Sequence, residues 1–414
     1  MRRNQQSDHR RTMIRLKACL MAVCLLLGLT SCNMTDGVNS PWLPSDTPAT
    51  NIPTAPVPPA PAVPAPDAQT MIPATPQKVA LLLPLSGRGA DTGQAMLNAA
   101  QLAMFDLQAS TYFELLPIDT NGGAAPAIKQ AVDNQTSLVL GPLFADNAKA
   151  IAPVAVQHGL NVVSFSTDTS AASGSTFLMG FTPQGQIEQI IDYAAAKGMH
   201  RIALIAPRSA YGDAAANTFV ARMQQRGLTN GGIARYAAGQ KPSNDDLWPV
   251  ASSSAPAIGR MGIDAVLIAA PSAEAAIVSD ALANGHGMPV NLVKRLGTGL
   301  WDTPETNALP SLRGAWYAAS SPRLRERFEQ RYAETYGAKP PRLASLAYDG
   351  AALAVVLAKS GKGYSRAALT SPSGFFGIDG VFRFGNNGIA ERGLAILEVN
   401  PSGARVIQEA PSRF

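Results

Sequence analysis

The sequence predicts an α/β fold of two lobes, each a doubly wound parallel sheet flanked by helices. Short apolar runs without polar alternation, such as residues 79–83, are typical of parallel strands that are covered on both faces. Helical stretches separate these runs, and strict alternation of strand and helix indicates βαβ units. The alternation begins again near residue 183. A chain of this length and hydrophobic content can bury two such cores.

The elements expected in the first lobe follow one another from residue 78 to residue 165. Strands are expected at 78–84, 112–117, 137–140 and 161–165. Helices are expected at 93–107, 126–134 and 145–158.

The second lobe is expected to repeat this build, after which the chain returns to the first. Its helices are expected at 184–197, 213–226, 245–260 and 273–284, and its strands at 201–206, 232–236 and 265–268. Two late helices, 322–336 and 343–359, are expected to pack on the first lobe. A hairpin-like end is expected from the strand 380–384, the turn 386–388 and the strand 394–399.

The N-terminus is expected to carry an export signal. Six basic residues precede an apolar run at 18–29, which is too short to span a bilayer. The tetrapeptide Leu29-Thr30-Ser31-Cys32 ends this run and resembles the lipobox of bacterial lipoproteins, which implies acylation of Cys32 after cleavage. Asn33 follows the cysteine, which in such lipoproteins favours the outer membrane. The alternative is an ordinary secretory signal with a chance cysteine.

Residues 33–77 are dominated by Pro, Ala, Thr and Ser, and this composition does not build a core. Seven prolines lie between Pro53 and Pro66. Proline-rich segments favour an extended polyproline II helix, so this segment could reach roughly 140 Å. It is expected to act as a semi-rigid stalk, and a passive spacer is favoured over a P-x-x-P ligand for an aromatic groove.

Charge and cysteine content exclude several classes of partner. Six of the 34 basic and one of the 29 acidic residues lie in 1–31, which leaves 28 of each in the rest of the chain. No basic tract remains for nucleic acid, so nucleic acid is not expected as a partner. All three cysteines lie at or before position 32, so neither disulfides nor cysteine-bound metal is expected in the folded part. No metal site and no cofactor are expected.

Catalytic motifs are also missing from the sequence. There is no G-x-S-x-G elbow, no S-x-x-K and no H-E-x-x-H. The glycine-rich loop 87–93 is a weak signal for dinucleotide binding and is expected to be a turn at the edge of a cleft. We therefore expect a protein that is not an enzyme.

The order of elements resembles the type I periplasmic binding protein fold from residue 79 to the C-terminus. The motifs that carry this resemblance are Ala80-Leu81-Leu82-Leu83-Pro84-Leu85-Ser86-Gly87 with Gly93-Gln94, Gly141-Pro142-Leu143, Asn161-Val162-Val163-Ser164-Phe165-Ser166, Tyr211-Gly212 and Gly380-Val381-Phe382-Arg383-Phe384. With the lipobox and stalk, they look most like the LpoA-type lipoproteins that activate penicillin-binding proteins. In those proteins a helical-repeat domain precedes the α/β module, whereas here the proline-rich segment holds that place.

The resemblance implies a division of the chain at three crossings, near Phe181, Ala318 and Ser373. The expected parts are a signal peptide at 1–31, a lipidated stalk at 32–77, the first lobe at 78–182, the second lobe at 183–318, return helices of the first lobe at 319–372 and a C-terminal crossover hairpin at 373–414.

A ligand cleft is expected at the carboxyl ends of the strands, where open α/β sheets collect ligands. The candidate residues are Ser86, Gly87, Asp146, Ser166, Thr167, Asp168, Tyr211 and Asp302. In amino-acid binders of this fold, hydroxyls hold the ligand carboxylate and an acid on the second lobe takes the ammonium. Here Phe144 stands where small hydroxyl residues usually lie, and no acid follows the segment 297–299 until Asp302. The alternative is that these polar residues only cap helices.

Three aromatic residues late in the second lobe, Trp301, Trp316 and Tyr317, are candidates for contact with a protein partner. Core packing is the alternative. The resemblance implies a non-enzymatic lipoprotein, anchored in the outer membrane and facing the periplasm, that stimulates a class A penicillin-binding protein, a peptidoglycan synthase. The alternative is a receptor of an ABC importer that binds a small polar ligand, such as an amino acid, in the cleft.

Overall fold

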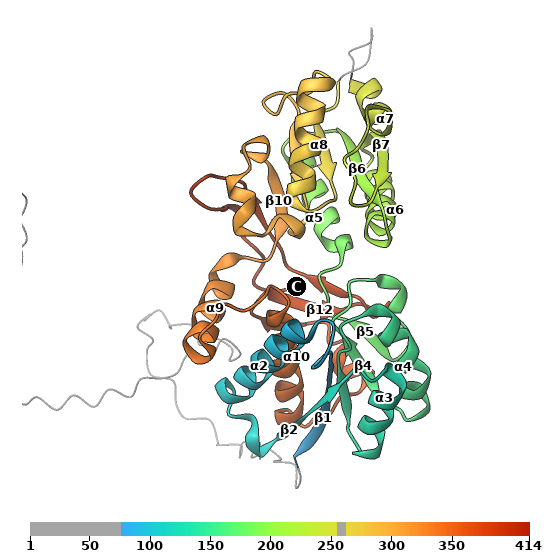
Figure 1. Cartoon of the computed structure of the whole chain (residues 1–414), viewed down its shortest axis with the longest axis vertical. Helices are drawn as coiled ribbons and strands as arrows, with labels where there is room; N and C mark the ends of the chain where they lie inside the picture. Colours follow the sequence, from blue (N-terminus) through green and yellow to red (C-terminus); the bar gives the residue numbers. More distant parts are fainter. Residues whose placement is uncertain (1–75, 255–261) are drawn as a thin grey trace, which may run out of the picture. The chain divides into compact units, whose positions relative to one another are not determined.

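The computed structural model describes residues 76–254 and 262–414, and Figure 1 shows its two α/β sheets. The first sheet is wholly parallel and has the order β2-β1-β3-β4-β5. Its strands are β1 (Gln77–Leu83), β2 (Phe113–Asp119), β3 (Leu138–Leu140), β4 (Asn161–Ser164) and β5 (Thr176–Leu178). This confirms the predicted α/β class with parallel sheets flanked by helices.

Helices cover both faces of the first sheet because β1 is apolar on both sides. Val79, Leu81 and Leu83 pack in one core with α2 (Ala90–Asp106), α9 (Pro322–Tyr336) and α10 (Ala344–Lys359). Ala80 and Leu82 point the opposite way and pack with α3 (Ala124–Asp133) and α4 (Ala145–Gln157). Successive side chains of a strand alternate between its faces, so an unbroken apolar run serves two cores.

The second sheet has seven strands in the order β15-β14-β10-β9-β8-β6-β7. Its bounds are β6 (Arg201–Arg208), β7 (Thr229–Ala237), β8 (Ala265–Ile268), β9 (Lys294–Gly297), β10 (Trp316–Ala319), β14 (Ala395–Glu398) and β15 (Arg405–Gln408). One face packs on α5 (Pro183–Ala196) and α6 (Ala210–Gln225). The other face packs on α7 (Asn244–Ser254) and α8 (Ser272–Gly285).

The C-terminal strands differ from the expected hairpin. β12 (Gly380–Phe384) pairs with β13 (Ala390–Arg392) and β11 (Phe375–Gly377) in a small antiparallel sheet. β14 does not continue that hairpin, because it pairs antiparallel with β10 and so belongs to the second sheet. The predicted turn at 386–388 is therefore right, but its second strand is β13, which is only three residues long.

Several short elements were not expected from the sequence. The strands β5, β9, β10, β11, β13 and β15 have three or four residues each. The remaining short helices are η1 (Ala109–Thr111), η2 (Thr169–Ala171), η3 (Gly299–Trp301), η4 (Pro304–Ala308), η5 (Pro310–Leu312) and α11 (Arg366–Leu369). Segments of this length show too few repeats of a hydrophobic period to be recognised.

Gly93 lets α2 lie close to the end of β1, and its substitution tests this packing. A Cβ at Gly93 would lie 2.0 Å from the backbone oxygen of Pro84, so Gly93→Ala must push the helix away. We expect a loss of about 2 kcal/mol in the free energy of unfolding, measured by urea denaturation. Gly185→Ala in α5 is the matched control, because nothing lies within 4 Å of its Cβ position. That control should be neutral or stabilising by about 0.5 kcal/mol.

Within the described ranges, no helix has the length and apolar character needed to cross a membrane.

Candidate functional site

Hydrogen bonds to the Asp119 carboxylate connect the loop after β1 to the loop after β2. The Ser86 hydroxyl donates to Asp119 Oδ2 at 2.5 Å, and the backbone N–H groups of Leu85 and Asn121 donate to Asp119 Oδ1 at 2.9 and 3.0 Å. These bonds, above all the one from Ser86, lower the pKa of Asp119. Gly87 has φ +60, and a Cβ there would lie 2.7 Å from the Asn121 side chain. Ser86 is thus already bonded to a neighbouring carboxylate.

The loop after β4 holds a second self-contained polar group. Buried Ser166 accepts a hydrogen bond from the Asp168 backbone N–H at 3.1 Å. Asp168 caps η2 by accepting from the backbone N–H of Ser170 at 2.9 Å and from its hydroxyl at 2.6 Å. Lys149 Nζ lies 3.3 Å from Asp168 Oδ2. The bond from the Ser170 hydroxyl is the main reason that the pKa of Asp168 is lowered.

Two further candidates, Asp146 and Thr167, are exposed at the ends of the same sheet. Asp146 lies in the first turn of α4, where a negative charge interacts favourably with the helix dipole. Phe144, directly before α4, is 46% exposed. The helix dipole accounts for Asp146 without a ligand.

Tyr211, the candidate from the second sheet, is engaged with a neighbouring loop. Its hydroxyl donates to Thr298 Oγ1 at 2.9 Å, and burial raises its pKa to about 12. Next to Thr298, the backbone N–H of Gly299 donates to Gln186 Oε1 at 2.7 Å. These two bonds hold the 298–299 loop, which follows β9, against α5 and α6.

Asp302, the acid expected to take a ligand ammonium, is already paired. Its side chain is only 6% exposed, and it receives two hydrogen bonds from the Arg325 guanidinium of α9, one of them at 3.0 Å. Arg342 Nε lies 3.6 Å from the same carboxylate. Among the described residues, no hydrogen bond or ion pair joins two candidates from different strand ends. The structure therefore does not assemble the eight predicted residues into one hydrogen-bonded site.

The three aromatic candidates divide between core and surface. Trp301 is fully buried and donates its indole N–H to Ala270 O at 3.0 Å, and Tyr317 is 2% exposed. Their burial supports the core-packing alternative and corrects the expectation that they contact a partner. Trp316 is half-buried, with its indole N–H 3.2 Å from Glu398 Oε2 and Lys294 Nζ 4.4 Å from the ring. Trp248 on α7, which the sequence-based predictions missed, is 63% exposed.

A buried charge network, also missed from the sequence, links α10, the small sheet and the segment before α10. Arg342 donates to Asp379 Oδ1 at 2.7 Å, and the Ser345 hydroxyl donates to Asp379 Oδ2 at 2.7 Å. The Asp349 carboxylate accepts the backbone N–H of Ile378 at 2.7 Å. Both carboxylates are fully buried.

Arg392 joins this network to the segment that leaves β5. Its guanidinium donates to Met179 O at 2.5 Å and lies 5.0 Å from the Phe181 ring. Arg342 stacks on the same ring at 4.1 Å. The network therefore contacts the chain close to the predicted crossing near Phe181.

The two buried carboxylates differ in charge. Burial, reinforced by the nearby charge of Asp379, raises the pKa of Asp349 to about 7. Burial acts on Asp379 in the same direction, but the charges of Arg342 and Arg392 outweigh it and lower the pKa of Asp379. Asp379 is therefore the ionised partner of the arginines at neutral pH.

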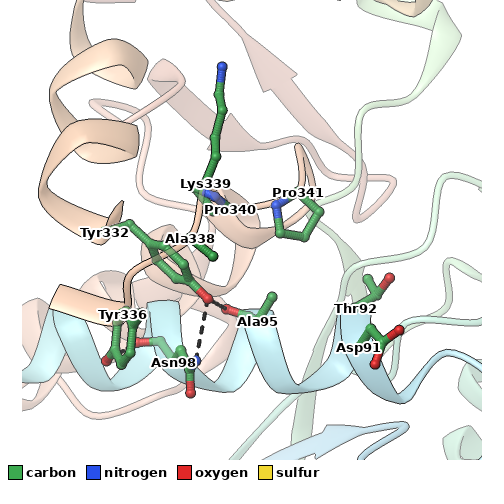
Figure 2. A pocket seen from close by; sticks show the side chains of 10 residues that line it. All are labelled: Asp91, Thr92, Ala95, Asn98, Tyr332, Tyr336, Ala338, Lys339, Pro340 and Pro341. Atoms are coloured by element: carbon green, nitrogen blue, oxygen red, sulfur yellow. Dashed lines mark hydrogen bonds between the residues drawn. The ribbon is translucent and has the colours of Figure 1, made fainter. Parts of the chain in front are cut away.

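A pocket of about 510 Å³ lies elsewhere, between α2, α9 and the segment 338–341 (Figure 2). None of the eight predicted cleft residues lines it. In the described ranges, no group of three or more His, Cys, Asp or Glu side chains could hold a metal ion. The predicted export signal, lipobox Cys32 and proline-rich stalk lie outside the described residues.

Residues 76–404, most of the chain, match the periplasmic binding protein family. The chain belongs to the periplasmic binding protein family. It is 29% identical over 150 residues to the penicillin-binding protein activator LpoA of Photobacterium profundum. That alignment covers 36% of this chain and 24% of the relative, so the likeness to this activator spans about a quarter of its length.

Solved structures of two functional classes share the fold. A putative branched-chain amino acid ABC transporter protein from Rhodospirillum rubrum matches with TM-score 0.69 and 20% identity, over 80% of this chain and all of that one. The C-domain of LpoA from Haemophilus influenzae, a regulator of PBP1A, matches with TM-score 0.62 and 18% identity, again over 80% of this chain and all of that one. Full-length LpoA from the same organism is covered over 59% of its length, with TM-score 0.62 and 19% identity.

These comparisons confirm the predicted resemblance to periplasmic binding proteins and LpoA. The matched proteins are binding proteins or regulators rather than enzymes, and they fit a location in the cell envelope. At these identities the structural matches establish the fold alone, so the choice between receptor and regulator depends on the site.

Proposed function

We propose that this protein is a non-enzymatic lipoprotein, anchored in the outer membrane through Cys32, that binds and stimulates a class A penicillin-binding protein. The observation that carries the proposal is the pairing of Asp302 with Arg325. A receptor for an amino acid needs a carboxylate for the ligand ammonium, and an ammonium buried without one costs several kcal/mol. Asp302 could serve only by giving up the buried Arg325, which would then keep only the longer contact with Glu329 at 3.5 Å.

The likeness to LpoA supports a penicillin-binding protein as the partner. The structural match covers the whole of the LpoA C-domain, and the curated relative is itself named a penicillin-binding protein activator. Stimulation requires only that the protein bind the active conformation of the synthase more tightly than the inactive one. Segment 32–77 would tether the folded part and set how far it reaches from the membrane. Trp316 remains a candidate contact, and Trp248 joins it because of its exposure.

Activity assays on the full chain test this proposal. The acylated protein, purified in mild detergent, is mixed with each class A penicillin-binding protein of its source, and the rates of glycan polymerisation and crosslinking are measured. We expect direct binding to one synthase and a several-fold faster rate of at least one reaction. Trp248→Ala and Trp316→Ala are compared at equal folded concentration, and the variant that lies at the contact should reduce the stimulation about tenfold.

The same experiments can also contradict the proposal. If no synthase binds or changes its rate, and native mass spectrometry of the gently extracted protein shows a bound small molecule, the receptor alternative replaces this proposal. Asp302→Asn separates the two functions further. A receptor that uses this acid would lose its ligand, whereas an activator would lose stability without losing its partner.

A further inference from the structure

The pocket beside α2 is a groove with aromatic walls. Tyr332 and Tyr336 of α9 pack with ring centroids 4.7 Å apart and an interplanar angle of 46°, and Pro340 and Pro341 form the adjoining wall. Tyr332 and Pro340 are buried, so the half-buried Tyr336 and the exposed Pro341 are the residues open to a ligand. Figure 2 shows both tyrosines directed toward α2, whereas Lys339 extends away from them. The groove follows α2 from Asp91 to Asn98, a distance of about 10 Å along the helix axis.

Hydrogen bonds fix the tyrosines in place. The Tyr336 hydroxyl donates to Asn98 O at 2.8 Å, and the Tyr332 hydroxyl lies 3.3 Å from Ala95 O and 3.4 Å from Asn98 Nδ2. The Thr92 hydroxyl and the second amide hydrogen of Asn98 make no hydrogen bond within the described residues. The groove therefore offers the Tyr336 ring and Pro341 for packing, with donors at its edge.

This chemistry suits a polyproline II peptide. Proline has no N–H, so a proline-rich segment presents carbonyl acceptors only and needs donors from its binding site. Proline rings pack well against aromatic walls, and the peptide is extended before it binds, which keeps the entropy cost small. One turn of polyproline II rises about 9 Å in three residues, which is the separation of the two prolines in P-x-x-P and matches the length of the groove.

We propose that residues 53–66 of this chain dock in the groove formed by α2, α9 and the segment 338–341. These residues contain seven prolines and the overlapping P-x-x-P pairs Pro53/Pro56, Pro56/Pro59, Pro58/Pro61 and Pro61/Pro64. Residues 40–76 carry two acids and no base, so apolar packing and hydrogen bonds make the contact. The docked state is accordingly insensitive to salt.

The tether is long enough for this contact. The described chain begins next to β1, whose seven residues span about 23 Å, and α2 returns alongside that strand. Residues 67–76 reach about 33 Å when extended, so Pro66 can reach the groove within one molecule. A short tether raises the effective concentration of the segment to the order of millimolar, which populates the docked state even when the free peptide binds weakly.

Docking has a direct consequence for the tether. Residues held in the groove no longer contribute to the distance that the folded part can move from the membrane, so the protein has a short-reach and a long-reach state. This inference does not depend on the identity of the partner, and it can be tested separately from the proposed activator function.

Site-specific photo-crosslinking of the full chain in detergent micelles tests the docking. The probe is p-benzoylphenylalanine in place of Val63, between Pro61 and Pro64, and the crosslinked peptides are identified by mass spectrometry. We expect crosslinks within one molecule to α2, α9 or residues 338–341, at a yield unchanged between low and high salt. Tyr336→Ala should reduce this yield about tenfold, because it removes one ring of the groove.

Matched variants keep the test decisive. Tyr336→Phe retains the ring and should retain the crosslink, as should Trp248→Ala, which removes an exposed aromatic from α7. Replacing Pro58, Pro59 and Pro61 together with alanine leaves every described residue intact and should abolish the crosslink. Crosslinks that fall elsewhere, that persist in Tyr336→Ala, or that appear only between two molecules overturn the proposal, the last in favour of a second copy as the occupant.

Discussion

Asp379→Ala is expected to lower the free energy of unfolding by about 4 kcal/mol, the largest loss that we predict for a single substitution of this protein. The Asp379 carboxylate is fully buried and accepts hydrogen bonds from Arg342 and Ser345. Its removal takes the ionised carboxylate away from Arg342 and Arg392. Asp349 accepts the Ile378 N–H rather than an arginine hydrogen bond, so it does not take over that role, and Arg342 keeps only Asp302, 3.6 Å away. An unpaired buried charge is costly, whereas the intact pair adds little net stability.

Urea denaturation near neutral pH, followed by circular dichroism and tryptophan fluorescence together, measures this loss. Coincident transitions of the two probes would justify a single free energy for the described part. Asp133→Ala is the control, since its pair with Lys129 is more than half exposed on both sides and should contribute less than about 0.5 kcal/mol. A loss below about 1 kcal/mol for Asp379→Ala would show that Asp379 is not the buried, ionised partner of the arginines.

The elements that were predicted correctly are those whose side chains carry a simple pattern. β8 was predicted at its observed bounds because Ala265–Ile268 is apolar throughout. β9 was not predicted, because two of its four residues are basic and it therefore shows no hydrophobic pattern. One of these basic residues, Arg295, is nevertheless only 1% exposed. The guanidinium of Arg295 is satisfied by Ser279 Oγ at 3.0 Å and by Val293 O at 2.9 Å. The fold brings these partners to Arg295, so its burial could not be predicted from the sequence of the strand alone.

The sequence pointed to polar residues but not to the partners that they already have in the folded protein. The sequence places Ser86 and Ser166 at strand ends and offers Asp302 as the first acid after the segment 297–299. The structure finds the polar groups of all three engaged by neighbouring side chains or backbone. Arg325 lies 23 residues after Asp302 on a helix assigned to another part of the chain, so no spacing rule connects them. Asp349 did leave a signal, because it is the only acid in the apolar helix Ala344–Lys359. An unexplained charge in such a run indicates a buried network.

Asp349→Asn is expected to change how stability depends on pH. The pKa of Asp349 rises from its ordinary 3.8 to about 7 in the folded protein. Between these values the folded protein holds a proton that the unfolded chain has lost, so the free energy of unfolding falls as pH rises, by at most about 1.4 kcal/mol per pH unit, and levels off above pH 7. Asparagine retains the oxygen that accepts the Ile378 N–H and removes the titration.

The stability difference between Asp349→Asn and the parent protein should therefore be about 3 kcal/mol more favourable to the variant at pH 8 than at pH 5. Urea denaturation at both pH values measures it, and groups that titrate in both proteins cancel from the comparison. Asp119→Asn is the matched control: the pKa of Asp119 is lowered, so its stability contribution is complete above about pH 5, and that variant should lose the same amount at both pH values. Parallel pH profiles for Asp349→Asn and its parent would mean that Asp349 is ionised in the folded protein, with Arg392 as its counter-charge.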